Sequence, residues 1–173
     1  MLALDSPRWA TLKASRGGSG SLTASLLRKA SGGDEEAFGE LYNQVCHQNS
    51  VGEVAYFAVP HLVHIAQAAA PQLRALMLSI VGSVVASRHC YSRSAAPMPA
   101  EAESEFVTAV ASARNLAAMS LAEATWSREF SFDLIATLAA LHGHADLTLF
   151  LQNGPELSCP ACGEAIEFRE NVG

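Results

Sequence analysis

The sequence predicts an all-α fold in which antiparallel helix pairs stack side by side into a superhelix and end in a small β-hairpin. Three observations support this fold class. Apolar side chains recur with the 3.6-residue period of an α-helix along most of the 173 residues. The chain contains 31 Ala and 20 Leu, which are both good helix formers. Short links containing Gly or Pro separate the periodic segments, and short links make consecutive helices antiparallel neighbours.

The first two helices are expected over residues 21–30 and 34–45. Leucines recur along one face of the first segment, and the Ser31-Gly32-Gly33 sequence supplies a glycine stop. Asp34 is suited to the N-cap of the second helix. The apolar stripe of this helix consists of Phe38, Leu41, Tyr42 and Val45.

A third helix is expected from about Glu53, after a turn at Asn49-Ser50, with Pro60 inside it. Because proline lacks an amide donor, we expect a kink there. Pro71 suits the first turn of a fourth helix, which runs on through Val84. Residues 89–100 contain two prolines among small and polar residues and are expected to form a long loop.

Three more helices are expected over residues 101–124, 131–142 and 145–152. The inner stripe of the fifth helix is mostly alanine, so a neighbouring helix can approach closely. The sixth helix has apolar residues on several sides, which indicates nearly complete burial, and Gly143 ends it.

The last residues break the helical pattern. Leu157, Ile166 and Phe168 alternate with polar neighbours around a Cys-Pro-Ala-Cys-Gly turn, which is typical of a small β-hairpin. We therefore divide the chain into a helical-repeat domain, residues 1–153, and a hairpin with its tail, residues 154–173. Stacked helix pairs share a continuous core and expose a concave face.

Composition excludes several classes of protein. The 50% hydrophobic content argues against intrinsic disorder. No run of 18 apolar residues is present, so we expect no membrane-spanning helix. The first residues include Asp5 and no apolar core of a signal peptide. Together with only four cysteines, this favours a location in the reducing cytoplasm.

Acidic residues are distributed unevenly along the chain. Residues 54–100 contain three arginines and no Asp or Glu, whereas residues 101–173 contain eleven acids and three arginines. A negative field repels nucleic acid and attracts basic proteins, although it also serves solubility. We expect no nucleic-acid or membrane partner, and a basic protein partner held by acids of the second half of the chain. The candidates are Glu101, Glu103, Glu105, Glu123 and Glu129.

Two stretches carry a resemblance to a known family. They include Trp9-Ala10-Thr11-Leu12, Leu41-Tyr42, His47-Gln48, Ala58-Val59-Pro60 and the Cys-Pro-x-Cys-Gly sequence at 159–163. Together they resemble bacterial HEAT-like, armadillo-type α-helical repeat proteins of poorly defined function. Asn49-Ser50 stands where that pattern usually has Gly-Thr. The resemblance implies an α-superhelical scaffold and no reaction, and some small proteins of this kind resemble immunity proteins that neutralise secreted toxins.

The sharpest chemical motif is Cys159-x-x-Cys162, because two thiolates on a tight turn can bind one zinc ion. A full site needs two more ligands. These ligands could come from His142 and His144, from His89 with Cys90, or from a second subunit. The alternative is a zinc-free hairpin in which the cysteines pack as small apolar groups.

Other polar and aromatic residues are expected to serve structure. His61 and His64 lie three apart on a helix, but the Glu of an HExxH motif is absent, which favours a hydrogen-bonded core histidine over a metal ligand. The His47-Gln48 pair is expected to hold an inter-helix turn. Trp9 is expected to cover the open end of the stack, and Trp126 to plug the elbow between two late helices.

No arrangement of nucleophile, base and acid stands out, and we expect no enzymatic activity. The leading functional prediction is a protein-binding module. A candidate role is that of an immunity protein, a toxin inhibitor that blocks a basic secreted nuclease by shape and charge. The alternatives are a metalloprotein that binds zinc through Cys159 and Cys162 with histidines, and a scaffold or adaptor protein.

Overall fold

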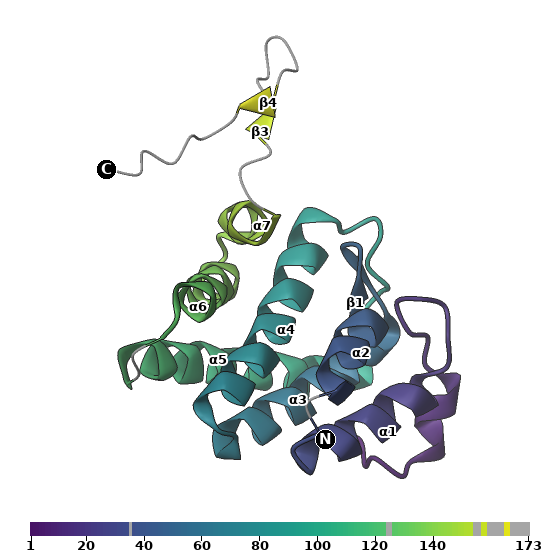
Figure 1. Ribbon diagram of the computed structural model, residues 1–173. Helices are drawn as coiled ribbons and strands as arrows, with labels where there is room; N and C mark the ends of the chain where they lie inside the picture. The colour runs from purple at the N-terminus through teal and green to yellow at the C-terminus, as the bar shows by residue number, and fades with distance from the viewer. Residues whose placement is uncertain (35, 124–125, 154–156, 159–164, 167–173) are drawn as a thin grey trace.

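The computed structural model describes residues 1–34, 36–123, 126–153, 157–158 and 165–166. The described residues are mostly helical, which confirms the all-α class (Figure 1). The elements are η1 Pro7–Thr11, α1 Gly20–Ser31, α2 Glu36–Val45, β1 Cys46–His47, β2 Ser50–Val51, α3 Glu53–Ala68, α4 Pro71–Cys90, α5 Ala100–Glu123, α6 Arg128–Leu141, α7 Ala145–Asn153, β3 Leu157–Ser158 and β4 Ala165–Ile166.

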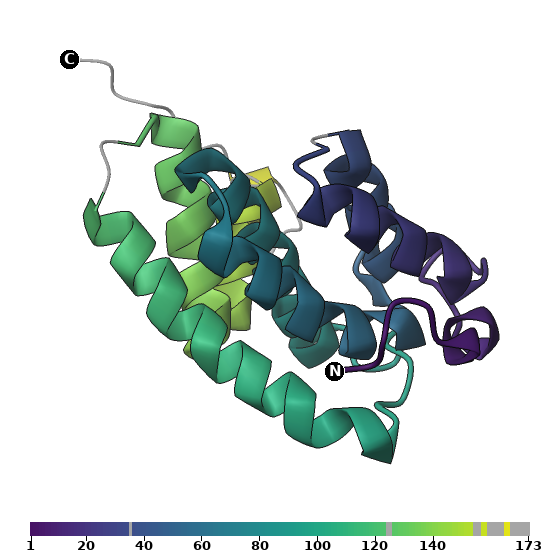
Figure 2. The same cartoon turned by 90° about the horizontal axis from the view of Figure 1, so that it is seen from below.

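The helices form two layers. In one layer α1 packs against α3 and α3 against α5, while in the other α2 packs against α4 and α4 against α6. Each helix of the first layer also packs on the helix that follows it in the chain. Helix α7 then covers α6 and α4, and Figure 2 shows α5 running along the side of this body. None of the helices in the described ranges is both long enough and apolar enough to cross a bilayer.

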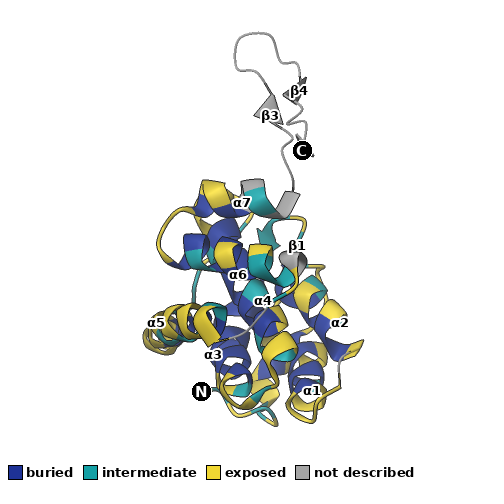
Figure 3. Cartoon of the chain, turned by 60° about the vertical axis from the view of Figure 1, so that its left-hand side comes forward, coloured by how far each residue is buried: buried dark blue, intermediate teal, exposed yellow. Residues whose placement is uncertain are grey.

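The core is centred on α3 and α4, whose residues are largely buried (Figure 3). Pro60 lies inside α3, which continues to Ala68. Helices α4 and α6 approach closely at Gly82, where an added Cβ would lie 2.9 Å from the Cα of Thr137. A side chain at position 82 would therefore force these two helices apart.

Local signals fix most helix ends. Gly33 and Gly143 both have a φ of +86°, the left-handed conformation that glycine adopts readily at the end of a helix. The expected start of the sixth helix at residue 131 was wrong. Ser127 is the N-cap, and its side chain accepts a hydrogen bond from the amide of Phe130, so α6 begins at Arg128.

The segment between α2 and α3 differs from the prediction. His47 and Gln48 lie between the two helices, as expected, but the sequence did not predict that β1 and β2 pair there in a tight hairpin. Gln48 and Asn49 form its turn with φ values of 47° and 61°. Two consecutive residues with positive φ are the mark of a type I′ turn, which matches the twist of paired strands.

The residues after η1 pack on this hairpin. The hydroxyl of Ser15 donates to the carbonyl of Ser50 at 2.7 Å and accepts from the amide of His47 at 2.9 Å. The amide of Ser15 donates to the carbonyl of Gln44 at 2.8 Å. On the other side of the hairpin, the thiol of Cys46 is buried 3.4 Å from the hydroxyl of Ser87 on α4.

Strands β3 and β4 pair antiparallel, with Leu157 opposite Ile166. The Cys-Pro-Ala-Cys-Gly sequence between them lies outside the described residues, as do residues 167–173. The division of the chain at residue 153 stays a prediction.

Candidate binding groove

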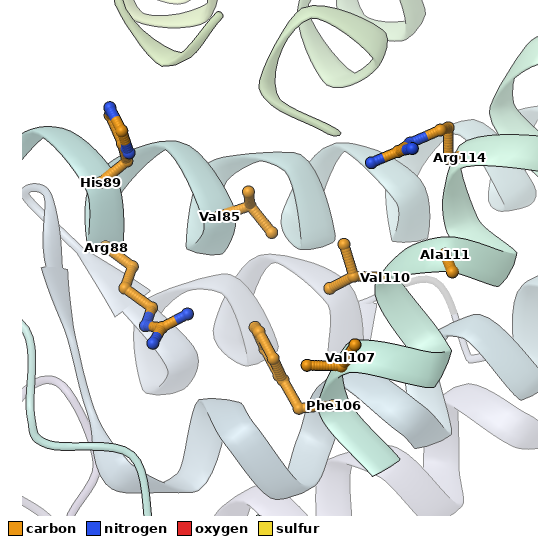
Figure 4. A pocket seen from close by; sticks show the side chains of 8 residues that line it. All are labelled: Val85, Arg88, His89, Phe106, Val107, Val110, Ala111 and Arg114. Atoms are coloured by element: carbon orange, nitrogen blue, oxygen red, sulfur yellow. The ribbon is translucent and has the colours of Figure 1, made fainter. Parts of the chain in front are cut away.

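A groove lies between the C-terminal half of α4 and residues 106–114 of α5, with a cavity of about 560 Å³ (Figure 4). Residues on two successive turns of α4 face residues on several turns of α5 across it. The groove is lined by Val85, Arg88, His89, Phe106, Val107, Val110, Ala111 and Arg114. A cavity of this size falls within the range of small-ligand and peptide-anchor pockets.

Aliphatic and aromatic side chains form the middle of the groove. Val85 comes from α4, and Val107, Val110 and Ala111 come from α5. Phe106 is 3% exposed, whereas Val107 is 57% exposed. An apolar group that covered Val107 would remove its surface from water, which favours binding.

Arg88 is positioned by two aromatic rings. Its guanidinium carbon lies 5.8 Å from the ring centroid of Tyr56 and 5.8 Å from that of Phe106. These two rings pack edge to face with centroids 5.4 Å apart. The Tyr56 hydroxyl donates to the carbonyl of Ala96 at 2.6 Å, so the loop before α5 fixes the ring. Cation–π contacts of this kind hold a guanidinium in place without neutralising it.

Arg114 stands at the other end of the groove and connects α5 to α6. Its Nε and Nη2 atoms donate to the carbonyl of Leu141, the last residue of α6, at 3.0 and 2.6 Å. A cation at a helix C-terminus is stabilised by the helix dipole. Since a guanidinium has five N–H donors, further donors remain for a ligand.

The lining of the groove contains two arginines and His89 but no acidic residue. Burial raises the pKa of the Tyr56 hydroxyl, and the charge of Arg88 partly offsets this rise. The groove thus combines an apolar centre with cationic ends. Such a surface can bind a ligand that carries both an apolar group and a carboxylate or another anion.

The predicted partner-binding acids are not brought together. Glu101 pairs with Arg8 at 2.8 Å, Glu105 with the α-amino group of Met1, and Glu123 with Arg74 at 3.6 Å. Glu103 is exposed on α5, and the side chain of Glu129 lies outside the described residues. Positions 101 and 123 are separated by about 33 Å along α5 at 1.5 Å per residue. These acids therefore form no single patch, and their role in binding a basic protein stays a prediction.

The zinc prediction stays untested. Cys159 and Cys162 lie outside the described residues, and His142 and His144 are exposed at the link between α6 and α7. Within the part of the chain that the structure describes, no group of three His, Cys, Asp or Glu side chains is placed to hold a metal ion.

His61 makes the hydrogen bond expected of a core histidine. It is 8% exposed, and its Nε2 donates to the carbonyl of Leu2 at 2.8 Å. Burial lowers the pKa of His61, while the bond to Leu2 acts in the opposite direction. His64 is exposed on the same helix, so the two side chains lie in different environments.

Trp126 lies at the expected elbow between two late helices, whereas the expectation that Trp9 covers the open end of a stack stays a prediction. Trp9 is 1% exposed on η1, and its indole N–H donates to the carbonyl of Ala3 at 2.9 Å. Trp126 lies at the elbow between α5 and α6, where its indole N–H donates to the carbonyl of Ser120 at 2.9 Å and its ring packs against Phe130.

Sequence reasoning missed the groove itself. None of Arg88, Phe106 and Arg114 was among the candidate binding residues predicted from the sequence. The signal that points to it is the absence of acids from residues 54–100, which supply the α4 side of the groove.

Comparisons with protein-family models, with curated proteins and with solved structures find no match for this chain.

Proposed function

We propose that this chain is a non-catalytic module that binds another protein in the groove between α4 and α5. The observation that carries the proposal is the groove lining, in which Arg88 is held in place by Tyr56 and Phe106 beside an exposed apolar surface. Exposed apolar surface rimmed by positioned arginines is typical of protein-binding sites, where Arg and aromatic residues are enriched.

The positions of other polar groups support a binding role. Arg28 donates to the carbonyl of Leu4 at 2.6 Å, and Arg74 donates to the carbonyls of Ala66 and Ala69 at the end of α3. These groups, like His61, are used to tie elements of the body together. Arg114 also joins two helices, through the carbonyl of Leu141, but both it and Arg88 line a cavity that a partner can enter.

The two-layer packing supports the finer fold proposal of a HEAT-like superhelix. In such a stack each helix pair contacts its neighbours on either side, as α1, α3 and α5 do in one layer. The body would then serve as a rigid scaffold that sets the width of the groove. An immunity-type role belongs to the same proposal, because occlusion of a toxin needs a rigid binding surface and no catalytic group.

Photo-crosslinking in cells tests the proposal. A photoreactive residue with a small aliphatic diazirine side chain, much smaller than tryptophan, is placed at Ala111, which is exposed in the groove, and as a control at Leu22, which is 47% exposed on α1. We expect a discrete protein adduct from position 111 that position 22 does not give. The absence of a protein adduct at position 111, or the same adducts from both positions, would contradict the proposal.

A further inference from the structure

We infer that the segment of the partner that enters the groove is an acidic peptide, whose carboxylates bind Arg88 and Arg114 on either side of an apolar side chain. This inference rests on the proposed function and adds the chemistry of the occupant. It reverses, for this one site, the expectation of a basic partner that the net charge of −6 suggests.

Charge complementarity is the first argument. The ion pairs found among the described residues join acids to Arg8, to Arg74 and to the α-amino group of Met1. Neither Arg88 nor Arg114 takes part in them. Two guanidinium groups that have no carboxylate partner among the described residues and share one groove are suited to bind carboxylates, which bind arginine through paired charge-assisted hydrogen bonds.

The arrangement of the groove is the second argument. Figure 4 shows Arg88 and His89 at one end, Arg114 at the other, and Val85 and Val110 between them. Along α5 the distance from Phe106, against which Arg88 packs, to Arg114 is about 12 Å, or eight residues at 1.5 Å each. An extended peptide covers this distance in about four residues, which places an apolar side chain between two acidic ones.

Acidic residues near the groove reduce its attraction for an acidic peptide but do not neutralise its two arginines. Glu103 lies one helical turn before Phe106. Asp146 lies near Cys90 at the end of α4: burial of the Cys90 thiol raises its pKa, and the negative charge of Asp146 raises it further. More distant carboxylates are screened, because the Debye length is about 8 Å at physiological ionic strength. Removal of the negative charge at position 103 is therefore expected to strengthen peptide binding.

Selection from a random peptide display library tests the inference on the full chain. The library is selected against wild-type protein, and the enriched peptides are then crosslinked to protein carrying the photoreactive residue at Ala111. We expect enriched peptides with Asp or Glu flanking Leu, Ile or Phe. Their affinity should fall about tenfold in Arg88→Gln, which corresponds to about 1.4 kcal/mol, because this substitution removes charge-assisted hydrogen bonds to a carboxylate.

Matched variants distinguish peptide binding in the groove from a general effect of the protein's charge on affinity. Arg93→Gln removes an exposed arginine outside the groove lining and should leave the affinity unchanged. Arg88→Lys keeps the charge but loses the guanidinium that lies over the rings of Tyr56 and Phe106, and should bind more weakly than wild type. Glu103→Gln should bind about twofold more tightly, as expected for the loss of one exposed charge.

The outcomes distinguish the two claims. Acidic peptides that crosslink at position 111 and depend on Arg88 support the inference. Neutral or basic peptides that crosslink there overturn it and leave the proposed function intact. If no enriched peptide crosslinks at position 111, both the proposed function and this inference fail.

Discussion

Gly52 lies directly against the backbone of Ser15. A Cβ atom at position 52 would stand 2.5 Å from the amide nitrogen of Ser15, 2.7 Å from the carbonyl carbon of Ala14 and 2.8 Å from the carbonyl oxygen of Lys13. Backbone atoms cannot rotate away as a flexible side chain can. The contact therefore requires glycine, and it joins the segment after η1 to the hairpin between α2 and α3.

Gly52→Ala is expected to destabilise the protein by about 2–4 kcal/mol, because the two segments must separate and lose their mutual hydrogen bonds. Gly39→Ala is the matched control. Among the described residues, no atom outside the backbone of α2 lies within 4 Å of a Cβ at position 39, so alanine there should stabilise by about 0.5–1 kcal/mol. Urea unfolding followed by circular dichroism measures the free energy of unfolding of both variants. Equal changes in the two variants would contradict the close contact between Gly52 and the backbone of Ser15.

The turn of the hairpin offers a second test. Gln48 has a φ of 47°, a conformation that costs energy for residues other than glycine and Asn. We expect Gln48→Gly to raise the free energy of unfolding by about 0.5–1 kcal/mol, and Gln48→Val to lower it by at least as much. Thermal unfolding of the two variants checks this; a more stable valine variant would show that the turn has a different backbone conformation.

His61 should make the stability fall on acidification. Burial lowers its pKa below the ordinary value of 6.5, so the unfolded chain binds a proton before the folded chain does. The free energy of unfolding should therefore decrease as the pH falls below about 6.5. In His61→Gln, whose amide can still donate to the carbonyl of Leu2 but does not titrate, this decrease should be smaller. Parallel stability curves for the two proteins between about pH 8 and pH 5 would contradict it.

The zinc hypothesis predicts stoichiometric metal in untagged protein. Elemental analysis should find zinc in the wild type and none in Cys159→Ser. Loss of zinc in His142→Gln would assign that side chain as a further ligand, whereas retention would point to one of the other candidates. Metal-free protein after purification in the absence of chelators would rule against a zinc site.

The helices could be predicted from the sequence because their signals are local. The apolar stripe of α2 and the glycines that end α1 and α6 act within a few residues of the chain. The predicted start of α6, at residue 131, lies three residues after the observed start at Arg128. Serine is a favourable N-cap residue and occurs at both 127 and 131, so the sequence alone did not distinguish the two starts.

The hairpin at Cys46–His47 and Ser50–Val51 could not be predicted in this way. Each of its strands has two residues, which is too short for a period-two pattern to be seen. Its stability also depends on Ser15, more than 30 residues earlier in the chain, and hydrogen bonds over that distance leave no local pattern.

The groove was missed for a related reason. Arg88 and Arg114 are separated by the whole loop before α5 and by more than half of that helix. The sequence contains their charges and the lack of nearby acids, but only the packing of α4 against α5 and α6 places them at the two ends of one cavity. The acids Glu101, Glu105 and Glu123 instead form ion pairs within the chain.

The affinity of the crosslinked partner for two tryptophan variants tests the central claim most directly. Ala111→Trp fills the groove from an exposed position, and Leu22→Trp makes a comparable change on α1. Isothermal titration calorimetry should show binding weakened at least about tenfold, or 1.4 kcal/mol, by Ala111→Trp and unchanged by Leu22→Trp. Wild-type affinity in the Ala111→Trp protein would contradict the assignment of this groove as the binding site.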